Sequence, residues 1–328
     1  MQVSSGRRDA AWKNGTGKRL GWSYTDDGVI SMPTKKRLDN VYKHAAIVPY
    51  NENSKFIIMS DCHRGQGNTG DNFLPNQILH FAALEYYYKQ GFTYIELGDG
   101  DELWENRKIK PIIEAHSDIF WMMSKFYNDN RLYMLYGNHD IVKQRQFVRH
   151  QNYHQFYCDS KECVLPLFPG IQMLEGLVLE HTETKKQILL VHGHQGSFLN
   201  DTIWPVARFL VRYVWRPLEL VGFTAPTGAG RSHNKKEKIE KKLAHYANSE
   251  QKMLIAGHTH RPVYPHPGTG LYLNDGSCVH PRCITGLEIE NNQISLVKWA
   301  VNSRSDRTLY VERQVLEGPE QIMDFYIS

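Results

Sequence analysis

Five short apolar runs that each end in histidine, aspartate or asparagine constrain the fold more than any other feature of the sequence. The runs are FIIMSD (56–61), TYIELGD (93–99), RLYMLYGNHD (131–140), QILLVHGH (187–194) and KMLIAGHTH (252–260). Each has the length of a buried strand with polar residues at its carboxyl end. Because ligands in α/β folds gather at the carboxyl ends of strands, we expect these polar residues to meet in one site.

Helical patterns lie between the early runs. Prolines can begin helices over residues 75–88 and 111–127. Strands and helices that alternate in this way indicate βαβ units. Residues 171–192 instead favour a hairpin, and the tail from Gly270 alternates apolar and polar residues as strands do. The predicted fold class is α/β, with two packed mixed sheets flanked by helices.

The composition is that of a soluble globular protein. Of its 328 residues, 41% are hydrophobic and 23% are charged, and no run approaches the length of a membrane-spanning helix. The polar N-terminus lacks the apolar stretch of a signal peptide. Five cysteines are too few for a disulfide framework in a chain of this length. These features predict a cytoplasmic protein.

Two basic segments flank an acidic body. Residues 1–44 and residues 201–247 each carry nine Lys or Arg and four Asp or Glu. Because residues 1–50 show little periodicity, we expect a basic, weakly ordered N-terminal extension before one domain over residues 51–328.

The second basic segment predicts a helical insertion at about residues 200–247. Arg208, Arg212 and Arg216 are spaced by four, so they share one helix face, and apolar residues fall on the opposite face. A second helix is indicated where Glu237 and Lys241 form a favourable i,i+4 pair.

The polar residues at the strand ends make chemical sense as metal ligands. Neutral imidazoles, carboxylates and one amide suit ions of intermediate hardness such as manganese, iron or zinc. There are enough ligands for two ions, and two ions about 3.5–4 Å apart can clamp the oxygens of an in-line phosphoryl displacement. A water that bridges them would lose a proton near neutral pH.

In this order, the motifs resemble the calcineurin-like metallophosphoesterase superfamily, whose pattern is DxH, GDxx(D/E), GNH(D/E), an isolated His and GHxH. They stand here as DCH (61–63), GDGDE (98–102), GNHD (137–140), His192 and GHTH (257–260). The resemblance covers roughly residues 55–300. It implies a four-layer sandwich of two β-sheets between helices, with a binuclear metal centre at the strand ends.

By motif position, the resemblance implies two ligand sets that share a bridging aspartate. The sets are Asp61, His63, Asp99 and His260 for one ion, and Asp99, Asn138, His192 and His258 for the other. Manganese is the expected ion, with iron, zinc and magnesium as alternatives. His139 matches the histidine that faces the substrate phosphate, where it would stabilise charge or protonate the leaving oxygen. Asp140 would orient that imidazole.

Neighbouring residues leave alternatives open. Glu102 stands where many members have Asp, but Asp101 lies beside it, so the acidic residue behind the metals is ambiguous. Arg64 is either a phosphate clamp or a surface charge. His194 either reaches the substrate phosphate or hydrogen-bonds a loop. Cys62 is interpreted as a packing residue, because adjacent side chains of an extended strand point in opposite directions.

Residues 200–247 also look similar to the helical lid of UDP-2,3-diacylglucosamine pyrophosphate hydrolases, a branch of the superfamily whose lid holds acyl chains near the metals. This similarity implies a phosphorylated small-molecule or lipid-linked substrate, and Arg208 and Arg212 are candidate substrate contacts. A basic amphipathic helix could also lie on the inner face of the membrane. The alternative is that the apolar face of the lid packs on the body.

The predicted function is hydrolysis of a phosphoester or pyrophosphate bond by a bridging hydroxide held between two metal ions. A protein Ser/Thr phosphatase-like activity is disfavoured because the lid would crowd a folded substrate. A nuclease-type phosphodiesterase is disfavoured because no basic stripe is interleaved with aromatic residues, so nucleic acid is not an expected partner. A non-catalytic scaffold would lack ligands that are all present here. The oligomeric state is left open.

Overall fold

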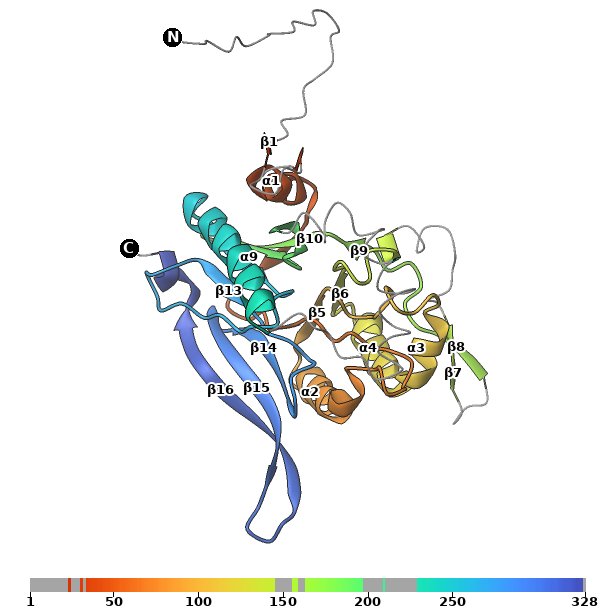
Figure 1. The fold of residues 1–328 in the computed structure, drawn as a ribbon. Coiled ribbons are helices and arrows are strands. Elements are labelled where there is room, and N and C mark those ends of the chain that lie inside the picture. Colours follow the sequence, from red (N-terminus) through yellow and green to blue (C-terminus); the bar gives the residue numbers. More distant parts are fainter. Residues whose placement is uncertain are drawn as a thin grey trace, which may run out of the picture.

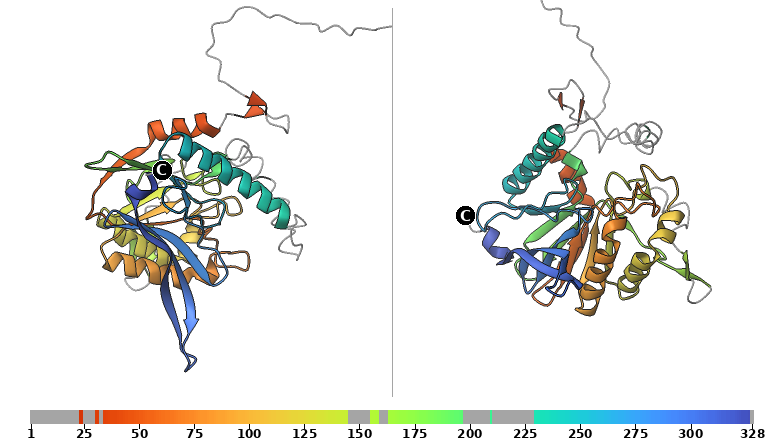
Figure 2. Two further views of the ribbon diagram at one scale, coloured as in Figure 1. Left: turned by 90° about the vertical axis from the view of Figure 1, so that its left-hand side faces the viewer. Right: turned by 60° about the horizontal axis from the view of Figure 1, so that its bottom comes forward.

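Two mixed β-sheets pack face to face between layers of helices (Figures 1 and 2). The computed structural model describes residues 23–24, 30–31, 34–144, 155–158, 163–196, 209 and 229–326. Within them, the four layers are a helical layer, a five-stranded sheet, a seven-stranded sheet and a second helical layer. This architecture confirms the predicted α/β sandwich.

The smaller sheet has the strand order β13-β12-β11-β10-β3. In that order the strands span Tyr272–Asn274, Met253–Ala256, Gln187–Val191, Gly176–His181 and Ala46–Tyr50. β10 and β11 pair antiparallel, which confirms the hairpin expected over 171–192, and the other neighbours pair parallel. Two strand ends that carry site residues, β11 and β12, therefore point the same way.

The larger sheet has the strand order β16-β15-β14-β4-β5-β6-β9. In that order the strands span Leu309–Gln321, Gln293–Ser303, Cys283–Glu290, Phe56–Met59, Thr93–Leu97, Leu132–Leu135 and Met173–Leu174. β4, β5, β6 and β9 are parallel, whereas β14, β15 and β16 form an antiparallel meander. The β15–β16 hairpin extends away from the body of the fold (Figure 1).

Short two-stranded ribbons lie outside these sheets. They are β1 (Ser23–Tyr24) with β2 (Ile30–Ser31), and β7 (Gln155–Cys158) with β8 (Cys163–Pro166).

The helices form the two outer layers. α1 (Thr34–His44) and α9 (Ala229–Ser249) contact the five-stranded sheet, whereas α2 (Gln77–Lys89) and α4 (Ser117–Asn128) cover the seven-stranded sheet (Figure 2). Pro75 lies in the 3-10 turn that leads into α2, as expected for a proline at a helix start.

The single helix expected over residues 111–127 is wrong in one respect. The chain forms α3 (Lys110–Ala115) and α4, with a break at His116, whose φ of −119° and ψ of 37° are not helical. The His116 imidazole is fully buried and lies between Asp71, at 2.8 Å, and Gln77, at 2.9 Å. These tertiary contacts hold His116 in place at the break between α3 and α4.

Strand alternation divides the core into two clusters. In β4, Phe56 and Ile58 face the other sheet, whereas Ile57 and Met59 pack with residues of α2 and α4. A strand buried on both faces reads as a continuous apolar run, which is why the sequence FIIM shows no polar alternation.

The weakly ordered extension predicted over residues 1–50 is wrong for residues 34–50. Leu38 and Val41 of α1 are buried, and β3 pairs in parallel with β10. Of the predicted insertion, 209 and 229–247 lie within the described residues, and the latter belong to α9. Arg208 and Arg212 lie outside them, as do most residues of the predicted lid.

Candidate metal centre

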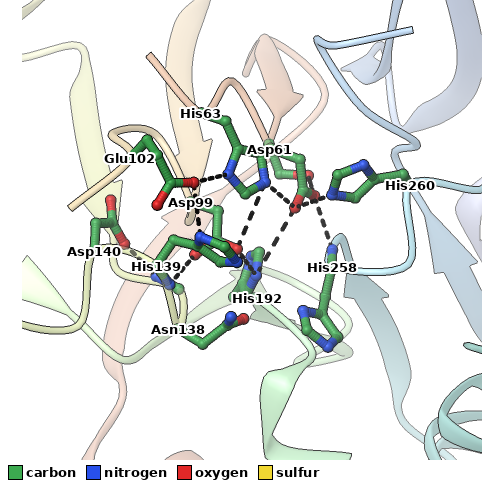
Figure 3. Close-up of polar contacts among 12 residues, drawn as sticks. Asp61, His63, Asp99, Glu102, Asn138, His139, Asp140, His192, His258 and His260 are labelled. Atoms are coloured by element: carbon green, nitrogen blue, oxygen red, sulfur yellow. Dashed lines mark hydrogen bonds and ion pairs between the residues drawn. The ribbon is translucent and has the colours of Figure 1, made fainter. Parts of the chain in front are cut away.

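The polar residues that follow five strands converge on one site (Figure 3). They follow β4, β5, β6, β11 and β12, at the end of each strand where the sequence placed them. The residues are Asp61, His63, Asp99, Asn138, His139, His192, His258 and His260. The convergence at the strand ends is therefore confirmed.

Unusual backbone geometry aims these side chains. Five of the residues have left-handed φ values between 48° and 68°, a region that non-glycine residues seldom adopt and that is enriched at functional sites. They are Asp61, His63, Asp99, His258 and His260. Backbone hydrogen bonds hold the turns together, because the Asp61 and His63 amides donate to the carbonyls of Gly98 and Asp99.

The motif glycines allow the strand ends to approach closely. A Cβ at Gly137 would lie 2.1 Å from Asp99 Oδ1, and one at Gly98 would lie 2.7 Å from His192 Nδ1. Gly98 also has a φ of 95°, which favours glycine. These two positions therefore require the absence of a side chain for the site to assemble.

Two neighbouring groups of ligand atoms form the centre. In the first, Asp61 Oδ1 lies 3.6 Å from His63 Nε2 and 3.0 Å from His260 Nε2. In the second, His192 Nε2 lies 3.1 Å from Asp99 Oδ2, and His258 completes the group.

The two groups are contiguous. Asp99 Oδ2 lies 3.8 Å from His63 Nε2, and Asp61 Oδ1 lies 3.9 Å from His192 Nε2. Asp99 Oδ2 therefore lies between the two groups of ligand atoms.

Several of the facing atoms are buried without a well-directed hydrogen bond among the described residues. They are Asp61 Oδ1, His63 Nε2, Asn138 Oδ1 and His192 Nε2. The other ring nitrogens are engaged, since His192 Nδ1 lies 3.0 Å from the Leu97 carbonyl and His63 Nδ1 lies 3.0 Å from Glu102. Such contacts turn the Nε2 lone pair toward the centre, as at metal-binding histidines. The donor set therefore fits divalent ions.

Burial and neighbouring charges shift the pKa values of His192 and Asp61 in opposite directions. Burial alone would lower the pKa of His192, but Asp99 and Asp61 outweigh it and raise the pKa to about 9. Burial would raise the pKa of Asp61, yet His260 and His192 hold it well below its usual range. Burial and the charge of His192 instead lower the pKa of His258 to about 3. The carboxylates thus create a strongly negative potential in which a cation is favoured.

His139 lies beside these groups and is held by Glu102. Glu102 Oε2 is 2.7 Å from His139 Nδ1 and 3.0 Å from His63 Nδ1. The ring stacks on Trp104 at a centroid distance of 4.2 Å, and its side chain is 25% exposed, so it can reach a substrate. Burial would lower the pKa of His139, but Glu102 and Asp99 raise it above its ordinary value.

The family comparison agrees with this geometry. The model for calcineurin-like phosphoesterases matches residues 54–262, a range that contains every residue of the converging site. The chain belongs to the calcineurin-like phosphoesterase family. Membership implies a hydrolase of phosphoesters that uses divalent metal ions.

Other comparisons add little to this assignment. Among solved structures, Vps29 of Chaetomium thermophilum is 11% identical, with a TM-score of 0.34 over 80% of this chain and 96% of that one. No curated protein matches the sequence. No helix in the described part of the phosphoesterase is long and apolar enough to span a membrane.

The role predicted for Asp140 is wrong. Its carboxylate is fully buried and accepts hydrogen bonds from the Gly137 and Gly100 amides at 2.7 and 3.2 Å, and from Lys143 at 2.6 Å. Asp140 therefore holds the loop together, and Glu102 is the carboxylate that contacts the His139 ring. Of the two acidic residues that the sequence left open, Glu102 is the one that contacts His63, a candidate metal ligand, whereas Asp101 pairs with Arg64 and Lys143.

Neither alternative for Arg64, a phosphate clamp or a surface charge, agrees with the structure. Its side chain is fully buried, with Nη1 and Nη2 donating to Glu96 at 2.7 and 3.0 Å and Nε donating to Asp101 at 2.7 Å. Asp101 also pairs with Lys143 at 2.8 Å. These groups form a buried ionic network behind the metal centre.

His194 lies at the back of the site. The residue is fully buried, and its ring centroid is 5.6 Å from that of His192 and 6.4 Å from that of Tyr136. Burial and the charge of His192 lower the pKa of His194 well below its usual range, so it remains neutral. Of the two alternatives, this position favours a structural role over contact with substrate.

The sequence interpretation missed Lys236, a basic residue of α9 that lies within range of the charge of Asp61. The side chain is half-buried, and the charge of Asp61 is among those that act on it. Burial lowers the pKa of Lys236 despite Asp61 and Glu240. The run NKKEKIEKK gave no signal for this residue, because one partly buried lysine does not change the pattern of a lysine-rich run.

Proposed function

We propose that the chain is a metal-dependent phosphohydrolase with a binuclear centre. Asp61, His63 and His260 would hold one ion, Asn138, His192 and His258 would hold the other, and Asp99 would bridge them. The observation that carries this proposal is the convergence of buried ligand atoms without well-directed hydrogen bonds. When bound, the two ions supply Lewis acidity toward phosphoryl oxygens and an activated water. Manganese is the ion we expect, with iron, zinc or magnesium as alternatives.

The residues of the chain position the reacting groups. Glu102 forms an ion pair with Nδ1 of His139 without a well-directed hydrogen bond, and we propose that Nε2 is the ring nitrogen that faces the substrate. With its pKa raised, His139 is suited to carry a proton and donate it to the leaving oxygen. Trp104 limits rotation of the ring by stacking on it, and the Trp104 indole donates to the Asn138 carbonyl at 2.5 Å. The same group thus steadies a proposed metal ligand and the proposed acid.

The substrate we propose is an anionic small molecule or a lipid-linked phosphoester or pyrophosphate. Lys236 supports this proposal as a basic residue of α9 on which the charge of Asp61 acts. The resemblance of residues 200–247 to a lid of pyrophosphate hydrolases supports it as well, with Arg208 and Arg212 as proposed contacts. Peripheral contact of this segment with the inner membrane face, in the cytoplasm, belongs to the same proposal.

The test combines metal analysis with a hydrolysis panel. The protein would be stripped and reloaded with Mn²⁺, Zn²⁺, Fe²⁺ or Mg²⁺ and assayed on an aryl phosphomonoester, an aryl phosphodiester, a UDP-sugar pyrophosphate, a phosphopeptide and single-stranded DNA. We expect ions bound at the N- and O-ligand centre and preferential hydrolysis of the pyrophosphate or a small ester. Preference for the phosphopeptide or for DNA would instead indicate a protein phosphatase or a nuclease.

Two single-histidine variants, one in the centre and one control, test the proposed mechanism in this assay. His139→Ala should retain the metal content while turnover falls by roughly 10²–10⁴. His266→Ala changes an exposed histidine outside the centre and serves as the matched control. Unchanged turnover in His139→Ala would remove its catalytic role, and absence of metal and turnover with every ion would overturn the proposed function.

A further inference from the structure

A buried cluster of two thiols and one imidazole lies behind the metal centre and takes no part in the proposed reaction. Cys62, His80 and Cys278 are each fully buried, and one potential ligand atom from each lies within 4.8 Å of the others. Cys62 comes from the DCH motif, His80 from α2, and Cys278 from the loop after β13. The cluster therefore joins three segments that are far apart in the sequence.

The side chain of Cys62 points away from the binuclear centre. Asp61 and His63 face that centre, whereas Cys62 packs in the core cluster between the larger sheet and α2. The sequence interpretation therefore placed the Cys62 side chain on the correct side of the strand end. It did not anticipate the two other sulfur and nitrogen groups that surround it.

We propose that Cys62, His80 and Cys278 bind a structural zinc ion. Thiolates and imidazole are the ligands that zinc prefers, and two thiolates with a neutral imidazole leave a Zn²⁺ complex without net charge, as burial requires. Binding releases the two thiol protons to solvent as the Zn–S bonds form.

The separations in the cluster fit this ion. With Zn–S of about 2.3 Å and Zn–N of about 2.0 Å, ligand atoms at tetrahedral to trigonal angles lie about 3.5–4.0 Å apart. Cys62 Sγ lies 3.8 Å from His80 Nε2, and the Sγ atoms of Cys62 and Cys278 lie within 4.8 Å of each other. Small side-chain shifts would therefore place all three ligands on one ion.

A fourth ligand position is also available. The Tyr94 hydroxyl lies 3.5 Å from His80 Nε2, on the same polar island in an otherwise apolar cluster. His80 Nδ1 has no hydrogen-bond partner among the described residues, so the ring is poorly satisfied where it stands. When Nε2 binds the ion, the ring proton lies on Nδ1, and the Tyr94 hydroxyl lies beside the fourth ligand position.

The backbone around the thiols is already held in place. The Cys278 amide donates to the Ser60 carbonyl at 3.2 Å, and Asn76 donates to the Cys278 carbonyl at 2.9 Å. A zinc ion would thus fasten α2 and the loop after β13 to the strand end that carries Asp61 and His63.

Because this site has sulfur ligands, a spectroscopic experiment can distinguish it from the proposed binuclear centre. The protein would be unfolded, refolded with Co²⁺, and examined for thiolate-to-cobalt charge-transfer absorption in the near ultraviolet. The binuclear centre contains only nitrogen and oxygen ligands, so it cannot produce that band, whether or not the proposed function holds. We expect the band, and one fewer ion per chain when Cys278→Ser removes it. Cys163→Ser and Cys283→Ser change half-buried thiols outside the cluster and should keep both.

X-ray absorption of the zinc-loaded wild-type protein keeps the test decisive if Cys278→Ser does not fold. Sulfur neighbours at about 2.3 Å from zinc would support the site. Zinc with only nitrogen and oxygen neighbours, absence of the cobalt band, or a Cys62–Cys278 disulfide in mass spectra of protein that was never exposed to reductant would each overturn it.

Discussion

Replacing Arg64 with methionine distinguishes a buried structural cation from a substrate clamp. The guanidinium donates three hydrogen bonds to Glu96 and Asp101, and all three side chains are fully buried. Methionine fills a similar volume but leaves the carboxylates without this cation. Removing one partner from a buried ionic network costs about 3–5 kcal/mol of unfolding free energy, because an uncompensated charge stays behind. We expect a loss in this range at pH 7.

The partners that remain after Arg64→Met indicate which carboxylate would account for most of the lost stability. Asp101 keeps Lys143 at 2.8 Å, whereas Glu96 keeps the Tyr94 hydroxyl at 3.4 Å. Burial raises the pKa of Glu96 even with Arg64 present, and loss of Arg64 would raise it further. A carboxyl whose folded-state pKa lies above its unfolded value binds more protons when folded, so its stability contribution falls as pH rises. The deficit of Arg64→Met should therefore shrink between pH 7 and pH 5.

Urea unfolding at both pH values measures this deficit. Lys89→Met is the matched control, because it removes a cation from an exposed i,i+4 pair with Glu85 and should cost at most about 0.5 kcal/mol. The double variant Arg64→Met/Glu96→Gln should recover part of the loss, since glutamine carries no charge. If Arg64→Met lost no more unfolding free energy than Lys89→Met and also had a raised KM for substrate, this reasoning would be refuted. The interpretation of Arg64 as a phosphate clamp would then be favoured.

Three further variants test the proposed centre. Asp99→Asn should weaken both metal sites together, and two tightly bound ions with normal turnover would exclude the bridging role. Glu102→Gln should lower metal affinity by about 10–100-fold in equilibrium dialysis, because Glu102 orients a proposed ligand, and should also lower kcat at saturating metal. Unchanged values for both would remove its positioning role. Lys236→Met should raise KM for an anionic substrate while kcat changes little, and an equal KM would show that this lysine does not face the substrate.

The sequence predicts the layered fold and the convergence of the site because both follow from local patterns. A run such as FIIM is apolar throughout only if both faces of its strand are buried, and parallel strands place their carboxyl ends at one edge. Side chains at those ends have few directions available, so Asp61, Asp99 and His192 could be placed together without coordinates. The motif order then supplied the family.

The partners of individual side chains could not be predicted in the same way. Arg64 follows a proposed metal ligand directly, yet it pairs with Glu96 and Asp101, which come from another strand and the loop after it. Asp140 adjoins His139 in sequence, but its carboxylate turns to backbone amides while Glu102 approaches the ring from a different loop. Sequence adjacency sets which backbone a side chain shares and does not set what it contacts.

Cys62 shows that the contacts of a side chain are hard to predict from the sequence even inside a functional motif. The alternation of an extended chain correctly turns its thiol away from the proposed ligands on either side, and the same rule makes it look inert. Whether such a thiol is inert depends on what the fold brings to the other face, which here is His80 and Cys278. A DxH motif needs only its first and third residues for the binuclear centre, so the middle position is free to build a second site on the opposite side of the same strand end.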